Sequence, residues 1–455
     1  MDADSSGAVS VAEFLSHVGA APSATAALLA AFRALDGDAS GDVTLGELAA
    51  ATHDVGLLGL DPEPQEVHLA LTGKPAEMRV MWVSGARYDA APTVVFGVDP
   101  ALPPPPSSAT AAGVSATYTV PKRWWPGFNG WIHDVLMTGL VPGRRYFYRV
   151  QGTIGGKASA SGVFNFTAPA LPAPDAATRL LVYGDMGVIP LGFLVAREIR
   201  ATPTVFNATL HVGDISWGRL EPCGDPCCDS PHPVWDQWAT MVQPFAADKP
   251  YMATIGNHEL FYNRTAFTHR FHGPDNGKRN TWFSFDVGNV HVTSMSTEDP
   301  YTPGSPQLTW LAADLAAAAA NRATVPWLVL VGHRPLYCSD TSEWSAHRPG
   351  APLLSSVEPL LLHHGVDLTI TGHQHCYERT FPVANGTVTT TGKGSPPVYT
   401  NAGAPLHVVV GTAGALQEET FVDPVPAWSA KRAANTLASY GFGDLTVFNA
   451  THLRW

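Results

Sequence analysis

The chain has 455 residues, of which 45% are hydrophobic and 15% are charged, so it is long enough for two or three domains with a sizeable core. Its formal net charge of −12 argues against a nucleic-acid backbone or an anionic membrane as a partner. No apolar run approaches the length needed to span a bilayer. These bounds indicate a globular protein that must attract any anionic substrate by local charge, and they leave its oligomeric state open.

Residues 1–59 carry two copies of a calcium-loop pattern. An EF-hand loop of 12 residues takes oxygen ligands at positions 1, 3, 5, 7 and 12 and needs glycine at position 6. The residues at the ligand positions of the two copies are Asp2, Asp4, Ser6, Ala8, Glu13, Asp36, Asp38, Ser40, Asp42 and Glu47. We predict an EF-hand pair that binds Ca²⁺, with its first motif truncated at the N-terminus. The alternative is two acidic, glycine-containing turns between helices.

Short apolar runs separated by proline and glycine turns occupy residues 60–170. Such runs lie at 67–71, 78–83, 93–96 and 145–150. Strands at this rhythm are typical of an antiparallel sandwich of about a hundred residues. The segment 168–177 is rich in alanine and proline and is interpreted as a linker.

In residues 171–455, five apolar runs are each followed by a short polar motif. The motifs are Gly184-Asp185-Met186-Gly187, Gly213-Asp214-Ile215-Ser216-Trp217, Gly256-Asn257-His258-Glu259, Val331-Gly332-His333 and Gly372-His373-Gln374-His375. Because α/β sheets hold their sites at the C-terminal ends of strands, we expect these side chains to lie together. Carboxylates, an amide and imidazoles are ligands that borderline divalent and trivalent metals accept. The pattern therefore predicts a large α/β domain with a two-metal site.

The five motifs in this order resemble those of the purple acid phosphatases of the metallophosphoesterase superfamily. Gly130-Trp131-Ile132-His133 and Tyr377-Glu378-Arg379 are further matches, and the resemblance covers residues 62–455. The expected fold is multidomain. It comprises an α-helical EF-hand pair at 1–59, an all-β fibronectin III-like sandwich at 60–170, and an α/β metallophosphoesterase domain at 171–455 in which a β-sheet sandwich is flanked by helices.

The resemblance also implies a role for each candidate site residue. It assigns Asp185 and His375 to a first metal, Asp214 to both metals, and Asn257, His333 and His373 to the second metal. Two cations about 3.5–4 Å apart can stabilise both oxygens of an in-line phosphoryl displacement. His258 is the expected electrostatic stabiliser or leaving-group acid, so the implied catalytic residues are His258 and Asp214.

Trp217 departs from the family pattern. The purple enzymes have a tyrosine at this position whose phenolate binds ferric iron, whereas an indole N–H is only a donor. The first metal therefore keeps three recognisable protein ligands. We expect iron with zinc or manganese, but without the phenolate little favours Fe(III) over Zn(II), Mn(II) or Fe(II).

A residue that touches the phosphate from outside the metal centre is not evident from the sequence. Arg334, Tyr337 and His347 are all candidates, although His347 is expected to lie too far along its loop. His232, His363 and His364 are interpreted as loop or helix-surface residues.

Sequon and cysteine usage point to the secretory pathway. Acceptors for N-glycosylation occur at Asn165, Asn207, Asn263, Asn385 and Asn449, where chance would give about two. Of the 5 cysteines, Cys223, Cys227 and Cys228 share a loop that favours a disulfide over a zinc site. The other two are Cys338 and Cys376, and the connectivity stays open. We expect a secreted, extracellular or vacuolar glycoprotein, with no signal peptide in the given chain.

The predicted function is a di-metal acid phosphatase that hydrolyses small phosphate monoesters by attack of a metal-activated water at phosphorus. Two alternatives stay open. One is a phosphodiesterase or nucleotide hydrolase of the same fold. The other is a catalytically weakened, calcium-binding extracellular protein.

Overall fold

The computed structural model describes residues 8–10, 40, 42–44, 60–120, 128–202, 205–216, 232–278, 280–417 and 420–455. Within these residues, no helix is both long enough and apolar enough to cross a membrane. The N-terminal segment contributes one small antiparallel pair, β1 (Ala8–Ser10) with β2 (Asp42–Thr44). The segment expected to form the helices of the EF-hand pair lies outside the described residues.

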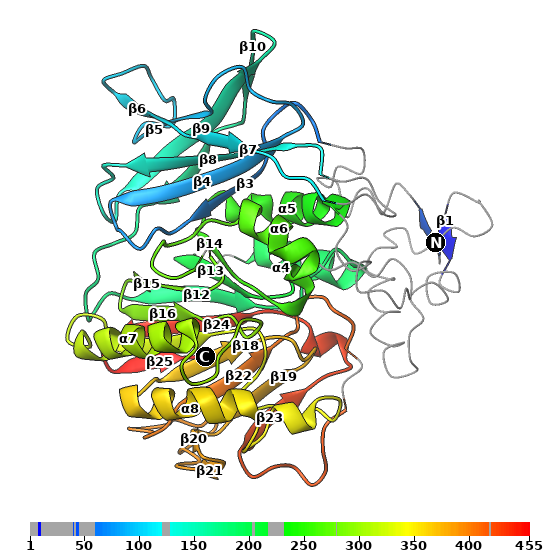
Figure 1. Ribbon diagram of the computed structural model, residues 1–455, viewed down its shortest axis with the longest axis vertical. Coiled ribbons are helices and arrows are strands. Elements are labelled where there is room, and N and C mark those ends of the chain that lie inside the picture. The colour runs from blue at the N-terminus through cyan, green and yellow to red at the C-terminus, as the bar shows by residue number, and fades with distance from the viewer. Residues whose placement is uncertain are drawn as a thin grey trace.

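A β sandwich forms the first large domain (Figure 1). One sheet has the order β3-β4-β8-β7, with β3 (Gln65–Ala70), β4 (Glu77–Ser84), β8 (Trp131–Thr138) and β7 (Val114–Ala116). The other has the order β10-β9-β5-β6, with β11 also on β9; they are β10 (Lys157–Ala160), β9 (Arg145–Ile154), β5 (Thr93–Gly97), β6 (Ser108–Ala112) and β11 (Phe164–Thr167). All pairings are antiparallel, and buried residues alternate along β9. The predicted sandwich is therefore confirmed.

Two further sheets pack face to face in the second large domain (Figure 1). The first has the order β14-β13-β12-β24-β25, with β14 (Tyr251–Thr254), β13 (Ala208–Val212), β12 (Thr178–Tyr183), β24 (Gly443–Asn449) and β25 (His452–Arg454). The second has the order β15-β16-β17-β18-β22-β19-β23. Its strands are β15 (Phe283–Val287), β16 (Val290–Ser294), β17 (Trp327–Val331), β18 (Leu368–Thr371), β22 (Leu406–Val410), β19 (Tyr377–Thr380) and β23 (Ser429–Ala433). A hairpin, β20 (Val383–Ala384) with β21 (Thr387–Val388), stands apart.

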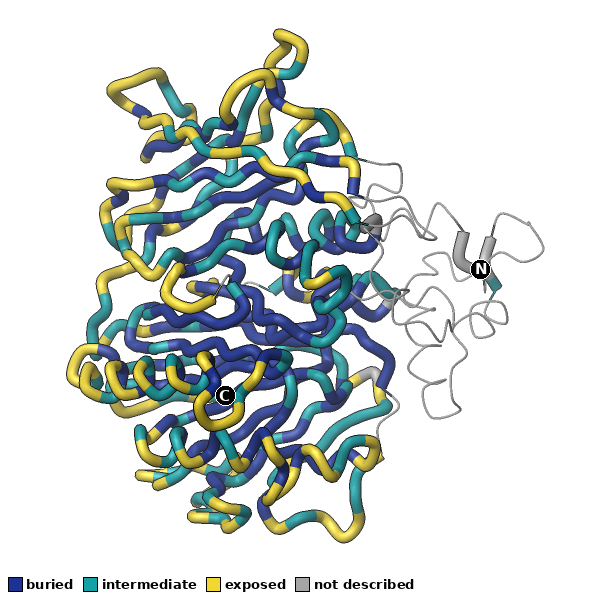
Figure 2. Tube along the Cα trace, viewed as in Figure 1, coloured by how far each residue is buried: buried dark blue, intermediate teal, exposed yellow. Residues whose placement is uncertain are grey.

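Helices cover both outer faces of this pair of sheets. The helices α4 (Pro190–Ala201), α5 (His232–Ala246) and α6 (Phe261–Arg270) lie between the first sheet and the sandwich, whereas α7 (Pro306–Ala320) and α8 (Pro352–His364) cover the second sheet (Figure 1). Short 3-10 turns occur at η2 (Asn257–Glu259), η3 (Trp344–Ala346) and η4 (Leu437–Ser439). The expected sheet sandwich flanked by helices is thus present. Among the described residues, its strands are the most continuously buried part (Figure 2).

The sequence determines the limits of the two outer helices. Ser305 caps α7, because its side chain accepts a hydrogen bond from the backbone N–H of Leu308, and proline follows at the first helical position. Leu311 and Leu315 lie on its buried face, while most of the alanines face outward (Figure 2). Gly365 ends α8 with a left-handed φ of 68°, a conformation that glycine adopts without steric cost.

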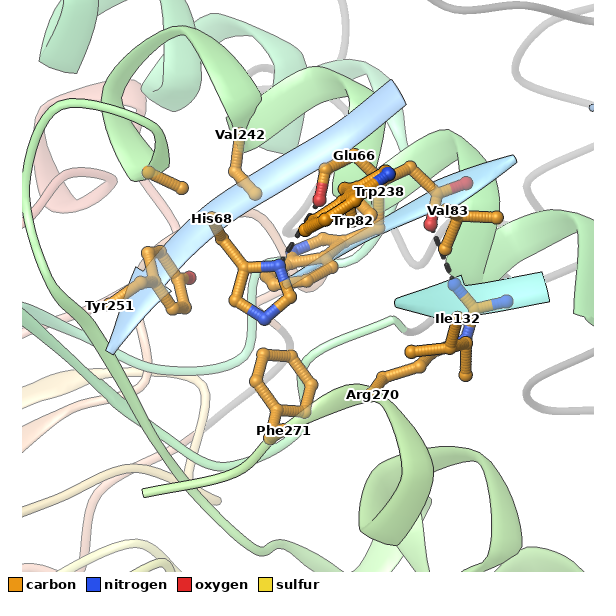
Figure 3. A pocket seen from close by; sticks show the side chains of 12 residues that line it. Glu66, His68, Trp82, Val83, Ile132, Trp238, Val242, Tyr251, Arg270 and Phe271 are labelled. Carbon is orange, nitrogen blue, oxygen red and sulfur yellow. Dashed lines mark hydrogen bonds and ion pairs between the residues drawn. The ribbon is translucent and has the colours of Figure 1, made fainter. Parts of the chain in front are cut away.

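A buried ion-pair network links the sandwich to the second large domain. Arg270 of α6 donates to Glu66 of β3 at 2.8 Å and also pairs with Asp236 of α5. A cavity beside this network is lined by Glu66, His68, Trp238 and Arg270, with further apolar neighbours (Figure 3). None of the candidate metal ligands lines it, so the cavity belongs to the domain joint.

Candidate metal centre

Each candidate ligand lies just beyond the C-terminal end of a strand. Asp185 follows β12, Asp214 follows β13, and Asn257 follows β14 in the first sheet. In the second sheet, His333 follows β17, whereas His373 and His375 follow β18. The strands β12, β13 and β14 are parallel neighbours, as are β17 and β18, so their ends gather the six side chains at one edge of the paired sheets.

Three of these ligands have a strained backbone. Asp185, Asp214 and His373 have φ values of 61°, 53° and 70°, in the left-handed region that non-glycine residues seldom adopt. Such conformations cost about 1–3 kcal/mol each and persist where surrounding contacts enforce them. The strain is therefore concentrated at the ends of the strands that carry the site.

Glycines before the ligands make room for neighbouring ligands. A Cβ on Gly213 would lie 2.4 Å from Nδ1 of His333, and one on Gly372 would lie 2.3 Å from Oδ2 of Asp185. Both distances are far below van der Waals contact. The Gly-Asp and Gly-His motifs thus have a steric reason, because any larger residue would push away a candidate ligand that follows a strand of the other sheet.

One group of candidate ligands contains the residues assigned to the second metal and surrounds His333. Its Nε2 lies 3.2 Å from Oδ1 of Asp214 and 3.0 Å from Oδ1 of Asn257, while its Nδ1 donates to the carbonyl of Val212 at 2.9 Å. A ligand atom from each of Asp214, His333 and His373 falls within 4.8 Å of the others. Because Nδ1 carries the hydrogen that it donates to this carbonyl, Nε2 is the nitrogen left for a metal.

The other group of candidate ligands belongs to the first metal of the assignment above and surrounds Asp185, which is fully buried. Its carboxylate accepts the backbone N–H of His373 at 2.9 Å and lies 3.6 Å from Nε2 of His375. Nδ1 of His375 donates to the carbonyl of Leu416 at 2.9 Å, which again leaves Nε2 facing the carboxylate. Among the described residues, this group is smaller than the one around His333.

Burial and neighbouring charges shift the pKa values of the groups in the centre in opposite directions. Burial raises the pKa of Asp185 well above its usual range, and the neighbouring Asp214 adds to the rise. Burial and Asp214 also raise the pKa of Glu259 to about 7. For Asp214, burial is outweighed by His333 and His258, which hold its pKa low.

Burial lowers the pKa of His373 and of His375 to about 4, so both imidazoles are neutral and can donate a lone pair. This donor set fits two cations.

Glu259 is a functional residue whose role the sequence did not reveal, although it stands in a recognised motif. Its buried carboxylate accepts backbone N–H groups from Asp214 at 2.9 Å, Ile215 at 2.8 Å and Gly256 at 2.7 Å. It thereby ties the loop after β13 to the loop after β14. The adjacent His258 donates its backbone N–H to Oδ1 of Asp214 at 3.1 Å, and its Nε2 lies 3.7 Å from Oδ2.

The outer residues on the loop after β17 differ from the sequence expectation. His347 was expected to lie too far away, but it is buried close to the centre, with Nε2 3.2 Å from Oε2 of Glu343. The same oxygen lies 3.0 Å from Nε2 of His373. The loop turns back through η3, so residues distant along the chain meet there. Glu343 was missed, because no motif surrounds it.

Arg334 and Tyr337 are placed very differently. The Tyr337 side chain is buried, and its hydroxyl donates to Glu358 at 2.7 Å, away from the ligands. The Arg334 side chain is 30% exposed; one of its guanidinium nitrogens lies 2.9 Å from Nε2 of His373, and another donates to Glu298 at 2.9 Å. Of the three candidates for contact with phosphate, Arg334 is therefore the one with both proximity and exposure.

Several predicted residues lie outside the described part of the chain. Trp217 and the loop with Cys223, Cys227 and Cys228 are among them. The predicted calcium ligands Asp2, Asp4, Ser6, Glu13, Asp36, Asp38 and Glu47 are also outside it. Ala8, Ser40 and Asp42 are described, and Ala8 and Asp42 belong to the β1–β2 pair.

Comparison with protein families matches three consecutive parts of the chain. Residues 64–168 match "Purple acid Phosphatase, N-terminal domain", residues 178–377 match "Calcineurin-like phosphoesterase", and residues 404–455 match "Iron/zinc purple acid phosphatase-like protein C". These parts contain the sandwich, the five motifs and the C-terminal strands.

Whole-chain relatives agree with this division. The chain is 33% identical over 404 residues to the mouse protein "Acid phosphatase type 7", with 86% of each chain covered. It is 30% identical to "Probable purple acid phosphatase 20" of Arabidopsis thaliana, covering 86% of this chain and 83% of that protein. A purple acid phosphatase from yellow lupin seeds has a similar structure, with a TM-score of 0.73, 25% identity, and coverage of 86% and 71% of the two chains. The chain belongs to the purple acid phosphatases, a family of metallophosphoesterases that hydrolyse phosphoesters at a dinuclear metal centre.

Proposed function

We propose that this phosphatase hydrolyses small phosphate monoesters, with Asp214 as the ligand shared by two transition metals. The observation that best supports this proposal is the position of Asp214. Its Oδ1 lies beside His333, and its negative charge acts to raise the pKa of Asp185 and of His373. The first metal would be held by Asp185, Asp214 and His375, and the second by Asp214, Asn257, His333 and His373. When bound, the two cations supply Lewis-acid charge to the phosphoryl group and lower the pKa of a nucleophilic water.

The chain's own residues would orient the ester and supply the proton. The side chain of His258 is 18% exposed and borders Asp214, so it can reach the leaving oxygen of a bound substrate. Arg334 places a guanidinium at the edge of the centre, where it can contact a phosphoryl oxygen. Glu298 and Glu343 hold that guanidinium in place. We therefore expect Arg334→Gln to raise KM more than it lowers kcat.

A substrate comparison tests the proposal against its nearest alternative. p-Nitrophenyl phosphate and bis-p-nitrophenyl phosphate share a leaving group but differ in phosphate charge. Faster turnover of the monoester, lost on metal removal and restored by added metal, is the expected result. A preference for the diester would instead favour the phosphodiesterase or nucleotide hydrolase alternative. Fewer than two transition metals per chain, with no turnover of either ester, would favour the catalytically weakened protein.

The metal pair is proposed to be iron with zinc or manganese. The family relationship supports a dinuclear iron-containing centre, and the imidazole and carboxylate donors accept all three metals. Trp217 takes no part as a ligand in this proposal, because an indole N–H cannot coordinate. Elemental analysis of protein purified without chelator identifies the metals directly.

We further propose that residues 1–59 form a calcium-binding EF-hand pair. The support beyond the sequence is the register of β1 and β2, in which Ala8 pairs with Thr44, Val9 with Val43, and Ser10 with Asp42. Val9 and Val43 are both position 8 of their predicted loops, so the two copies pair about their equivalent centres. This symmetry is what two related loops lying face to face would produce.

Calorimetric titration of the full chain with Ca²⁺ tests this part. Binding heat that is lost in the Glu13→Gln, Glu47→Gln double variant is expected, because the bidentate ligand at position 12 is removed from both loops. We expect Ca²⁺ to leave phosphatase turnover nearly unchanged. The absence of any calcium heat in the unmodified protein would show that the loops are acidic turns.

The protein is also proposed to be secreted or vacuolar and N-glycosylated. Among its five sequons, Asn207, Asn263 and Asn385 are exposed. A mobility shift after endoglycosidase treatment of protein from a secretory host is the expected outcome. Substitution of these three asparagines by glutamine would remove most of that shift, and an unmodified secreted chain would contradict the proposal.

A further inference from the structure

Two buried cysteines lie against each other beside the metal centre. Cys338 and Cys376 are both fully buried and form a small apolar cluster with Val409. The thiols are within hydrogen-bonding contact of each other. Nothing in the hydrolytic chemistry uses a thiol, so the pair needs a separate explanation.

The neighbouring residues fix the two cysteines in place. Ser339 donates its backbone N–H to Oε2 of Glu378 at 2.6 Å and its hydroxyl to Oε1 at 2.8 Å. The backbone N–H of Cys338 donates to the carbonyl of His347 at 3.1 Å, and that of Cys376 donates to Gln374 at 2.7 Å. The segments that carry the thiols are therefore joined by polar contacts that do not involve sulfur.

Both segments carry residues of the metal centre. Cys376 directly follows His375, and Cys338 lies on the loop that begins at His333 and continues to Glu343 and His347. A covalent bond between the sulfurs would tie that loop to the ligand segment after β18. It would restrict the separation of ligands that belong to different strands.

We propose that Cys338 and Cys376 form a structural disulfide that braces the metal centre. The oxidant is a low-molecular-weight disulfide such as oxidised glutathione. One cysteine thiolate attacks it and expels one glutathione thiolate, giving a mixed disulfide. The second cysteine thiolate then attacks the protein sulfur and expels the other. Two electrons pass to glutathione, and the two protons of the protein thiols end on two glutathione thiols. Because both cysteines are inaccessible in the fold, the bond forms before the segments close over it.

Tryptic mapping tests the pairing directly. Arg334 and Arg348 are each followed by proline, so trypsin releases a single peptide from Ala323 to Arg379 that contains these two cysteines and no sequon. The full chain, purified from a secretory host, is denatured and alkylated without reductant before digestion. The expected peptide is unalkylated and lighter than the reduced form by two hydrogens, and it accepts two alkyl groups after reduction.

Two results would overturn the proposal. One is alkylation of both cysteines without reductant. The other is a covalent link from either cysteine to the peptide containing Cys223, Cys227 and Cys228. A matched variant tests the bracing role, because reductant should lower the melting temperature of the unmodified protein by several degrees more than that of the Cys338→Ala, Cys376→Ala double variant. Equal reductant sensitivity in the two proteins would show that the bond does not stabilise the fold.

Discussion

Glu259→Gln is the substitution that tests most sharply how the centre is held together. The carboxylate receives three backbone N–H groups, two at Oε2 and one at Oε1. Glutamine has almost the same shape but only one oxygen. If that oxygen takes the place of Oε2, the amide NH₂ faces the N–H of Ile215, and a buried donor loses its acceptor.

The cost follows from that single lost contact. Above pH 7, where the Glu259 carboxylate is charged, a hydrogen bond to it contributes about 1.5–3 kcal/mol, and a buried unpaired donor costs a similar amount. We take about 2 kcal/mol, which corresponds to roughly a thirtyfold change in an equilibrium constant. The contact holds the loop of Asp214, whose backbone is strained at φ 53°. The loss should therefore appear as weaker metal binding, about thirtyfold, in addition to lower stability.

Competition with a chelator of known affinity measures the change in the full chain. Glu358→Gln is the matched control, because Glu358 is also buried and accepts both Tyr337 and the N–H of Asn385 at the same oxygen, Oε1. Glutamine can keep both of those bonds, so its metal affinity should equal that of the unmodified protein. Equal affinity in a folded Glu259→Gln protein would refute the assigned role of Glu259.

Other outcomes follow from the same structure. Asp214→Ala should abolish hydrolysis of p-nitrophenyl phosphate and cost more than Asn257→Ala, because it removes a ligand from both metals; unchanged turnover would contradict the site. The iron-loaded protein should lack the visible charge-transfer band of its purple relatives, and Trp217→Tyr should create one, as absorbance spectra would show. Burial opposes the charged form of His291, but hydrogen bonds to Asp286 and Asp314 raise its pKa to about 9. Since its ordinary pKa is about 6.5, it should contribute about 3 kcal/mol below pH 6.5 that is lost as pH rises through 9. Denaturant unfolding of His291→Gln should show a flatter profile over that window.

The general plan of the molecule could be predicted from local patterns. Strand-like runs and their polar motifs were adjacent in the sequence, and parallel strands place such motifs at one edge whatever the details of packing. The sandwich was recognisable for a similar reason, because short apolar runs with turns between them specify antiparallel strands. Both predictions depended on residues that are neighbours along the chain.

The outer part of the site could not be predicted in this way. Glu343 and His347 meet His373 because the loop after β17 turns back through η3, and nothing local in the sequence specifies that path. The expectation that His347 lies too far away used distance along the chain as a substitute for distance in space. That substitution fails wherever a loop folds over the site.

The contacts of Glu259 and of the interface between the two large domains could not be predicted from the sequence, for a different physical reason. A glutamate in a motif resembles a surface residue until its three backbone donors are known, and those come from loops of two strands. Likewise, Glu66 and Arg270 are 204 positions apart, yet they form an ion pair that is almost entirely buried. Each partner would be costly to bury alone. The pairing therefore exists only once both domains have folded against each other.

The strained backbones in the centre depend on contacts with neighbouring segments. Asp185, Asp214 and His373 hold left-handed backbones that an isolated loop would relax. Their positions persist because neighbouring segments fix them: Glu259 binds the N–H of Asp214, and Asp185 binds the N–H of His373. The second contact joins the first sheet to the second. A candidate metal ligand of one strand thus stabilises the strained backbone of a candidate ligand on another, so the geometry proposed for two metals depends on the assembled sheets and not on any single motif.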